Sequence, residues 1–339
     1  MIHLRIVVPD YQAEHALDLL DATPSVCNLI HLPRAAKRPV GDVILCDVSR
    51  DDASVVIADL RELDIDIEGS IAIEEVDSQI SLAATKAEKA GKLGGADPVV
   101  WEQLASKTNE SVEASPAFLI FMVLACLIAG VGIYFDQPIL IIGAMVVGPE
   151  FGPIAGICVA LVSQRHALAK RSAMALLIGF PLGIVATYLA TLALKGTGLI
   201  DATIDFDNHL LTRFISNPDF FSGYVAALAG IVGMLSLTSS KSSVLVGVLI
   251  SVATIPAAAN IGVAAAYTEW GEFGGAALQL AINLAAIFIA GLATLYVQRL
   301  IYVKRRRNHL SDDSRVAAGL PVGSSRRAKL DPKDEPDAV

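Results

Sequence analysis

The first 77 residues alternate between short apolar stretches and polar connections, which is typical of a small soluble domain. Four stretches have the spacing of strands, namely HLRIVV, SVCNLIHL, GDVILCDVS and DIEGSIAIEEV, with a polar loop AAKRP between the second and the third. Two helical stretches follow Asp10 and Asp51, residues suited to helix starts. The predicted order βαββαβ is that of an α+β ferredoxin-like domain with its helices on one face of the sheet.

Beyond Pro116 the apolar positions become continuous. Six runs carry no Asp, Glu, Lys or Arg apart from one glutamate, Glu150. These runs are Ala117–Phe135, Ile139–Gln164, Ser172–Leu194, Ser222–Ser240, Ser242–Thr268 and Phe273–Gln298. Because a spanning helix needs about 20 mainly apolar residues, the pattern predicts an α-helical polytopic membrane domain of six spans over residues 116–302.

The segments on either side of the apolar runs are polar. Residues 78–115, rich in Ala, Lys and Glu, predict a connecting helix and linker, interrupted near the sequence GGADP. Residues 303–339 lack periodicity and predict a disordered tail.

The distribution of basic residues predicts the orientation in the membrane. One side of the predicted bundle collects nearly all of them: Arg165, Lys170, Arg171, Lys241, Arg299, Lys304, Arg305, Arg306 and Arg307. Basic residues concentrate in cytoplasmic loops, so both termini are expected in the cytoplasm of a bacterial-type cell, with the spans in its inner membrane. The KRRR stretch follows a span directly, which favours an anchor on anionic lipid over a nucleic-acid patch.

Composition agrees with a membrane protein. Of 339 residues, 54% are hydrophobic and 18% are charged, and the mean hydropathy is +0.57. The formal charge of −9 says little by itself, because nearly all charged residues lie before Ser115 or after Arg299. This distribution argues against a strongly basic nucleic-acid binder. The N-terminus lacks the pattern of a secretory signal. The four cysteines form no CxxC pair, which favours free buried thiols over disulfides or zinc.

The second and fifth apolar runs resemble each other. GAMVVGPEFGPIAGICVA from Gly143 aligns without gaps with GVLISVATIPAAANIGVA from Gly247, and both carry a proline near the middle. If three spans are duplicated, the odd number places the copies in opposite orientations, which is the 3+3 inverted repeat of many secondary transporters. Packing is the alternative interpretation, because Gly148, Gly152 and Gly156 recur every fourth residue and permit close helix contact.

The sequence GAMVVGPEFGPIAG resembles the membrane family of domain of unknown function 389, the "uncharacterised hydrophobic domain" proteins. Its motif is matched by Gly143, Ala144, Met145, Pro149, Gly152 and Pro153, and Ile255–Ala258 lies in its second proline-bearing segment. Two residues depart from the family pattern: Gly148 replaces a common serine and Glu150 a common apolar residue. The resemblance covers about residues 117–303. It implies six spans, often with a soluble N-terminal domain, but neither a substrate nor an activity.

Glu150 is the leading candidate for a functional residue. A carboxylate at bilayer depth is costly, about 2.5–3.5 kcal/mol on insertion scales, so such residues usually face a cavity in an ion or proton pathway. Pro149 and Pro153 lack N–H groups and would free carbonyls of the preceding turn. Alternatively, Glu150 lies near the membrane interface or is held protonated against a backbone group.

Further polar residues accompany the second proline-bearing segment. The candidate substrate or ion site comprises Pro149, Glu150, Gly152, Pro153, Thr254, Pro256 and Asn260. Gln279 and Asn283 lie four residues apart on one helical face, where hydrogen bonds between helices explain them better than transport. His3 and His31 lack a third ligand, so no metal site is expected, and no cofactor.

Enzyme motifs are absent: the chain contains no Walker loop, GxSxG or HExxH pattern. Two functions stay open. The first is a secondary transporter or channel for a small solute or ion, with the lipid bilayer and a second copy of the chain as partners. The second is a membrane-anchored sensor or scaffold whose N-terminal domain binds a ligand or partner. We expect a homo-oligomer, with a dimer as the simplest form, and no nucleic acid.

Overall fold

The computed structural model describes residues 1–76, 80–91, 99–104, 108, 115–204, 206, 215–239 and 253–325. The chain divides into two compact units. The terminal unit contains both chain ends, Met1–Leu104 and Gln298–Val339, and the central unit contains Ala105–Val297.

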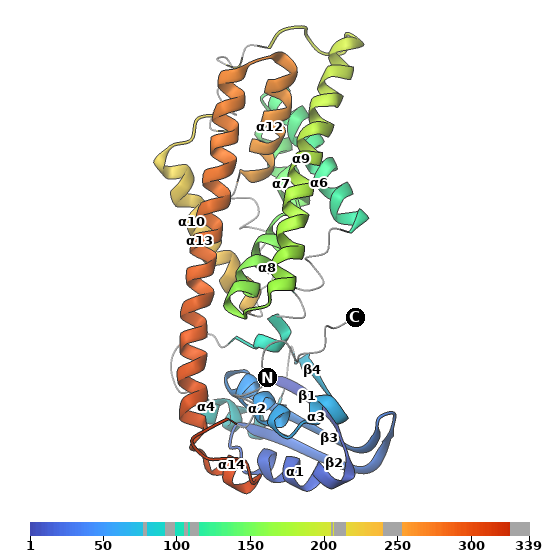
Figure 1. Ribbon diagram of the computed structural model, residues 1–339, viewed down its shortest axis with the longest axis vertical. Helices are drawn as coiled ribbons and strands as arrows, with labels where there is room; N and C mark the ends of the chain where they lie inside the picture. The colour runs from blue at the N-terminus through green and yellow to red at the C-terminus, as the bar shows by residue number, and fades with distance from the viewer. Residues whose placement is uncertain are drawn as a thin grey trace. The chain divides into compact units, whose positions relative to one another are not determined.

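A four-stranded antiparallel sheet forms the centre of the terminal unit (Figure 1). Its spatial order is β2-β3-β1-β4. The elements in chain order are β1 (Ile2–Val8), η1 (Asp10–Gln12), α1 (Ala13–Asp21), β2 (Val26–Lys37), β3 (Val40–Val48), α2 (Arg50–Glu62), α3 (Ile65–Glu68) and β4 (Ser70–Glu75). This order agrees with the predicted one, although β2 continues to Lys37 through most of the predicted loop AAKRP.

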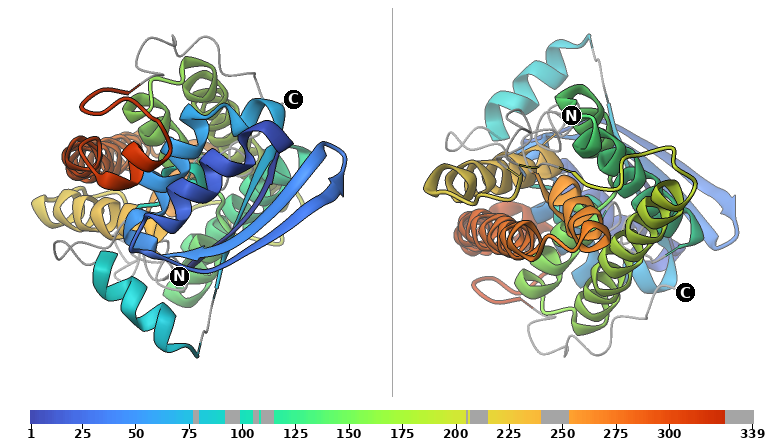
Figure 2. Two further views of the ribbon diagram at one scale, coloured as in Figure 1. Left: turned by 90° about the horizontal axis from the view of Figure 1, so that it is seen from below. Right: turned by 90° about the horizontal axis from the view of Figure 1, so that it is seen from above.

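One face of this sheet carries the core of the terminal unit. Alternate residues of β1, from Ile2 to Val8, are completely buried. They belong to one apolar cluster with Leu20 of α1 and Leu60 of α2, and Figure 2 shows these helices on one side of the sheet. Burial of each such side chain contributes about 1.5–3 kcal/mol. The period-two pattern of the strand therefore predicts the buried face correctly.

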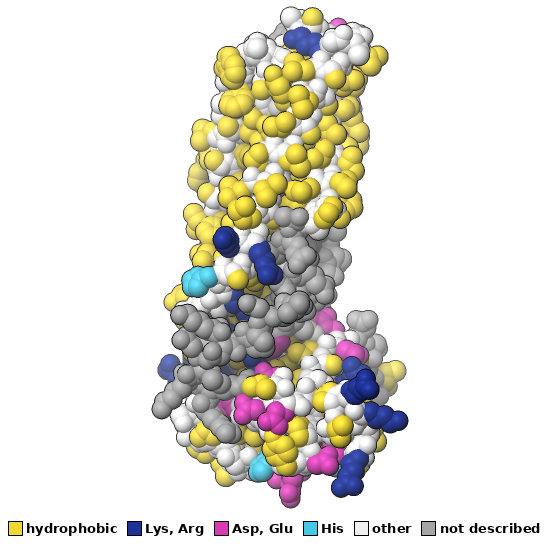
Figure 3. Space-filling view, turned by 45° about the vertical axis from the view of Figure 1, so that its right-hand side comes forward, with side chains coloured by type: hydrophobic (Ala, Val, Ile, Leu, Met, Phe, Trp, Pro, Cys, Tyr) yellow, Lys and Arg dark blue, Asp and Glu magenta, His cyan; other side chains and the backbone are white. Residues whose placement is uncertain are grey.

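Four helices of the described chain are long and apolar enough to cross a membrane: α6 (Pro116–Tyr134), α9 (His166–Gly196), α10 (Phe220–Thr238) and α13 (Trp270–His309). A bent pair, α7 (Pro138–Val147) and α8 (Phe151–Val162), makes a fifth candidate. Hydrophobic side chains cover the face of the central unit that Figure 3 displays. Among the described residues, four or five helical segments are thus long and apolar enough to span a membrane, where the sequence predicted six spans.

The predicted run Ser242–Thr268 has only its second half among the described residues. That half is α12 (Thr254–Tyr267), and residues 240–252, which include Lys241 and Ser251, lie outside the described part. Every residue of α12 except Ala265 is buried, and α12 packs against α6, α7 and α9. A helix that is apolar all round is expected at such an enclosed position.

The prediction of a disordered tail from residue 303 is wrong for residues 303–325. Helix α13 continues to His309, and α14 (Asp313–Ala317) follows it and packs against α1. Residues 326–339 lie outside the described part of the chain. In the predicted linker, α4 (Leu82–Gly91) is helical and belongs to the terminal unit. The reason for the wrong prediction is a set of ion pairs described below.

Candidate functional site

The predicted proline-bearing segment is a true break between two helices. Helix α7 ends at Val147, residues 148 and 149 are not helical, and α8 begins at Phe151 with its axis bent by 46° from that of α7. The second segment also starts a helix, because α12 begins at Thr254. Two helix N-termini are therefore present where the sequence predicts two interrupted spans.

The two helices carry a proline at the same helical position. Pro153 is the third residue of α8, and Pro256 is the third residue of α12. The first residues of a helix have no intrahelical partner for their N–H groups, so proline is tolerated there. The expectation that Pro153 frees carbonyls of a preceding turn is therefore wrong: Pro153 lies in the first turn of a new helix.

Glu150 joins the two helix starts. The hydroxyl of Thr254 donates a hydrogen bond to Oε1 of Glu150 over 2.6 Å. Glu150 is 4% exposed and Thr254 is 1% exposed. Among the described residues, the second carboxyl oxygen, Oε2, has no hydrogen-bond partner. The carboxyl group is thus enclosed, half satisfied, and held by a residue 104 positions away in sequence.

Gly148 leaves the space that this carboxyl group occupies. A Cβ atom at position 148 would lie 2.4 Å from Oε2 of Glu150 and 2.6 Å from Cγ1 of Ile255. Both distances are too short for real contacts. Gly148 follows α7, outside α8, so the predicted face of Gly148, Gly152 and Gly156 on one continuous helix is wrong for Gly148. Gly152 and Gly156 lie within α8, and Gly156 is buried.

The remaining predicted polar residues are also buried. Asn260 is 2% exposed, and its Oδ1 has no partner within the described chain. Gln279 and Asn283 are each 2% exposed and share one face of α13. The Gln279 amide donates to Oδ1 of Asn283 over 3.2 Å, which is a bond within one helix, whereas the prediction placed it between helices.

A charged cluster in the terminal unit was missed by the sequence analysis. Asp59 and Glu62 of α2 are fully buried, as is Arg315 of α14. Arg315 donates to both carboxylates, over 2.9 Å to Glu62, and Arg306 of α13 also donates to both. His309 lies 2.7 Å from Oδ2 of Asp59. We call these five residues the α2 ion cluster.

The α2 ion cluster explains the order of the chain after residue 303. Its basic members appear in the sequence as a solvated tail, but they neutralise two acids in an otherwise apolar core. A signal exists in the sequence, because Asp59 and Glu62 occupy the apolar spacing of α2. Their partners lie some 250 residues later, and spacing alone cannot identify them.

The two histidines on the strands pair with aspartates. His3 lies 2.7 Å from Asp47, and His31 lies 2.6 Å from Asp42. The backbone N–H of Arg34 and the side chain of His31 hold the pKa of the Asp42 carboxyl below its usual range. Among the residues that the structure describes, no group of three or more His, Cys, Asp or Glu side chains could hold a metal ion.

The break between α7 and α8 lies in a part of the chain that is similar to a known protein family. Residues 145–289 match the sequence model of the family described as domain of unknown function (DUF389). This stretch of the central unit is similar to the DUF389 family. The resemblance is confirmed over this range, which is narrower than the predicted 117–303. The DUF389 match contains Glu150, Thr254, Gln279 and the breaks around them.

The chain is also similar to an archaeal protein. An uncharacterised protein of Methanocaldococcus jannaschii is 30% identical over 197 residues, which are 56% of this chain and 58% of that protein. The chain thus matches less than two thirds of the relative's length. No solved structure matches the chain. The name of the DUF389 family specifies no reaction or solute, so function rests on the site itself.

Proposed function

We propose that this protein is a secondary transporter or channel for a small solute or ion, with its central site where α8 and α12 begin. One observation carries the proposal, the buried hydrogen bond between Thr254 and Glu150. An ionisable residue inside a membrane segment is a functional candidate by default. Here its partner comes from the other interrupted helix.

The arrangement matches the general plan of transporter sites. In that plan, discontinuous helices meet near mid-depth, and their termini contact the solute while exposed carbonyls and acidic groups hold ions or protons. Helix α7 ends and α8 begins at this site, and α12 begins there too. Irregular backbone at membrane depth is tolerated where protein or a cavity surrounds it.

An inverted 3+3 repeat of six spans is part of the proposal. The shared third-residue position of Pro153 and Pro256 supports it, because the one-residue offset in the sequence alignment disappears when the helix starts are compared. We place both termini in the cytoplasm and the spans in a bacterial-type inner membrane, on the distribution of basic residues. The N-terminal βαββαβ domain then serves as a ferredoxin-like regulatory module in a homodimer.

The test uses the full-length protein in liposomes that contain a pH-sensitive dye. Gradients of Na⁺, K⁺, Cl⁻ and a set of small organic solutes are imposed in turn, and proton movement is recorded. Glu150→Gln keeps the size of the side chain but removes its ionisation. We expect it to reduce solute-coupled proton flux at least tenfold.

Glu269→Gln is the matched control, because Glu269 is an exposed carboxylate in the turn before α13. It should leave the flux unchanged. If Glu150→Gln preserves both the flux and its pH dependence, Glu150 has no part in the mechanism.

A sensor or scaffold is the second candidate, and the α2 ion cluster favours it. The cluster fixes the C-terminal segment to the N-terminal domain, so a ligand or partner of this domain acts on a segment that continues from α13. Two results together would favour this function over transport. The wild-type protein in liposomes would conduct none of the tested solutes, and its terminal unit would bind a metabolite.

A further inference from the structure

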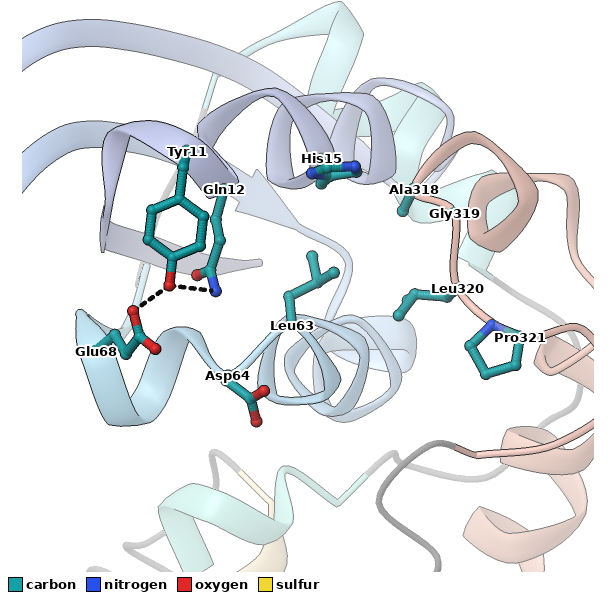
Figure 4. A pocket seen from close by; sticks show the side chains of 10 residues that line it. All are labelled: Tyr11, Gln12, His15, Leu63, Asp64, Glu68, Ala318, Gly319, Leu320 and Pro321. Atoms are coloured by element: carbon teal, nitrogen blue, oxygen red, sulfur yellow. Dashed lines mark hydrogen bonds between the residues drawn. The ribbon is translucent and has the colours of Figure 1, made fainter.

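The terminal unit contains a pocket of about 610 Å³ that none of the features above uses (Figure 4). One wall consists of η1, the start of α1 and the turn between α2 and α3. The opposite wall is formed by residues 318–321, which follow α14. The volume lies within the range of small-molecule sites, about 300–1,000 Å³. Tyr11 is 65% exposed, so the pocket is open to solvent.

Hydrogen bonds organise the polar wall. The Tyr11 hydroxyl donates to Glu68, and the Gln12 amide nitrogen donates to the Tyr11 oxygen over 3.2 Å. The bond to Glu68 raises the pKa of the Tyr11 hydroxyl above its ordinary value. The Gln12 oxygen Oε1 is buried and has no partner among the described residues. This oxygen needs a donor.

The charged side chains that line the pocket indicate the charge of its ligand. Glu68 and Asp64 are carboxylates, and none of the ten lining residues is Lys or Arg. The pocket therefore attracts positive charge. A metal ion would require more acidic or histidine ligands than the described residues gather anywhere. The phenol ring of Tyr11 also favours a cation, through its negative face.

Apolar side chains come from both walls. Leu63 of the first wall and Leu320 of the opposite wall are buried beside the pocket, and Pro321 adds to the opposite wall. Such a surface suits the carbon chain of a ligand. We propose that the pocket binds a small organic cation, an amine or guanidinium on a short carbon chain, with the charged group between Glu68 and the Gln12 carbonyl and the carbons on Leu63 and Leu320.

The ligand also acts on the C-terminal segment. The Leu320 N–H donates to the Arg315 carbonyl over 3.0 Å, and the Arg315 guanidinium donates to the Pro321 carbonyl over 3.1 Å. These two bonds connect the wall of residues 318–321 to Arg315, a member of the α2 ion cluster. A ligand that needs both walls binds the docked segment and stabilises it. Occupancy of the pocket and attachment of α14 are therefore linked.

The experiment compares two four-carbon probes on the full-length protein in detergent. Putrescine carries two ammonium groups, whereas succinate carries two carboxylates and has the same total number of carbons. Binding is measured by isothermal titration calorimetry, and docking by hydrogen exchange of residues 318–320. We expect saturable binding of putrescine, at least tenfold tighter than that of succinate, and slower exchange at Leu320 when putrescine is bound.

Two variants locate the binding. Glu68→Gln should weaken putrescine binding about tenfold, as expected for loss of a charge-assisted contact. Glu74→Gln, at an exposed position of β4, should leave it unchanged. The proposal is overturned if succinate binds as well as putrescine, if both variants behave alike, or if Mg²⁺ binds and putrescine does not. None of these outcomes bears on the proposed transport function, which concerns the site at Glu150 in the central unit.

Discussion

Asp59 and Glu62 in the terminal unit and Glu150 in the central unit are buried to almost the same extent but have very different partners. Two arginines and a histidine surround the first pair. Glu150 has one neutral hydroxyl, and one of its oxygens has no partner among the described residues. Complete neutralisation is what a structural cluster requires. The half-satisfied carboxyl group of Glu150 does not meet that requirement, and the proton or ion pathway that we propose for it is the usual role of a carboxylate inside a membrane segment.

The largest loss of stability should come from disruption of the α2 ion cluster, where the buried acids are neutralised. Arg315→Ala leaves Asp59 and Glu62 buried with fewer partners, and removal of one partner from a buried ion pair costs about 3–5 kcal/mol. We expect early loss of the terminal unit's fold and rapid hydrogen exchange in α14. Denaturant unfolding of the full-length protein, monitored by hydrogen exchange, measures the loss.

Arg5→Ala is the control for this variant, because Arg5 lies exposed on β1. Equal stability of the two variants would show that the α2 ion cluster does not hold the C-terminal segment.

A smaller loss of stability is expected from a substitution beside Glu150, the half-satisfied carboxyl group of the comparison. Gly148→Ala places a Cβ atom against Glu150 and Ile255, and such overpacking typically costs about 1–3 kcal/mol. Gly143→Ala in α7 is the matched control, because nothing lies within 4 Å of its added Cβ. Thermal unfolding in detergent measures both variants.

The double variant Gly148→Ala with Glu150→Ala separates the two neighbours. Removal of the carboxyl group should recover part of the lost stability, because the stability changes caused by substitutions at two residues in contact are not additive. Strictly additive losses would mean that Gly148 does not make room for Glu150.

The smallest effect concerns acid stability of the terminal unit. The pKa of Asp42 is lowered in the folded state, so its ionised form stabilises the fold above the usual aspartate range. That contribution is lost as the pH falls through the lowered value. Asp42→Asn should therefore reduce stability at neutral pH and flatten the acid side of the profile, whereas Asp18→Asn, at an exposed position of α1, should not. A melting profile between pH 2 and 7 with unchanged slope would contradict this.

Local patterns predicted much of the fold. The alternation in β1 and the two helical stretches after it gave the terminal sheet, and long charge-free runs gave α6, α9, α10 and α13. The prolines located both helix starts of the candidate site, although not their role in the first turn. The pairing of Glu150 with Thr254 needed the structure, because no spacing rule joins residues from two separate helices.

The α2 ion cluster could not be predicted in the same way. A run such as KRRR is a solvated anchor in most sequences near a membrane, and Arg315 stands alone in a polar segment. Arg306 of this run and Arg315 are enclosed because they pair with Asp59 and Glu62, two acids in the core of the same unit that lie about 250 residues earlier in the sequence. Such long-range electrostatic matches leave no periodic signal.

Helix α13 has forty residues without a break, which corresponds to a rod of about 60 Å. The buried amides Gln279 and Asn283 lie in its first half, and Arg306 and His309 contact Asp59 near its end. Arg306 and His309 are three positions apart, so a single face of the last helical turns carries both contacts to Asp59. A chain that ended before Arg306 would lack both of these contacts, together with the one from Arg315, and would leave the Asp59 carboxylate buried without them.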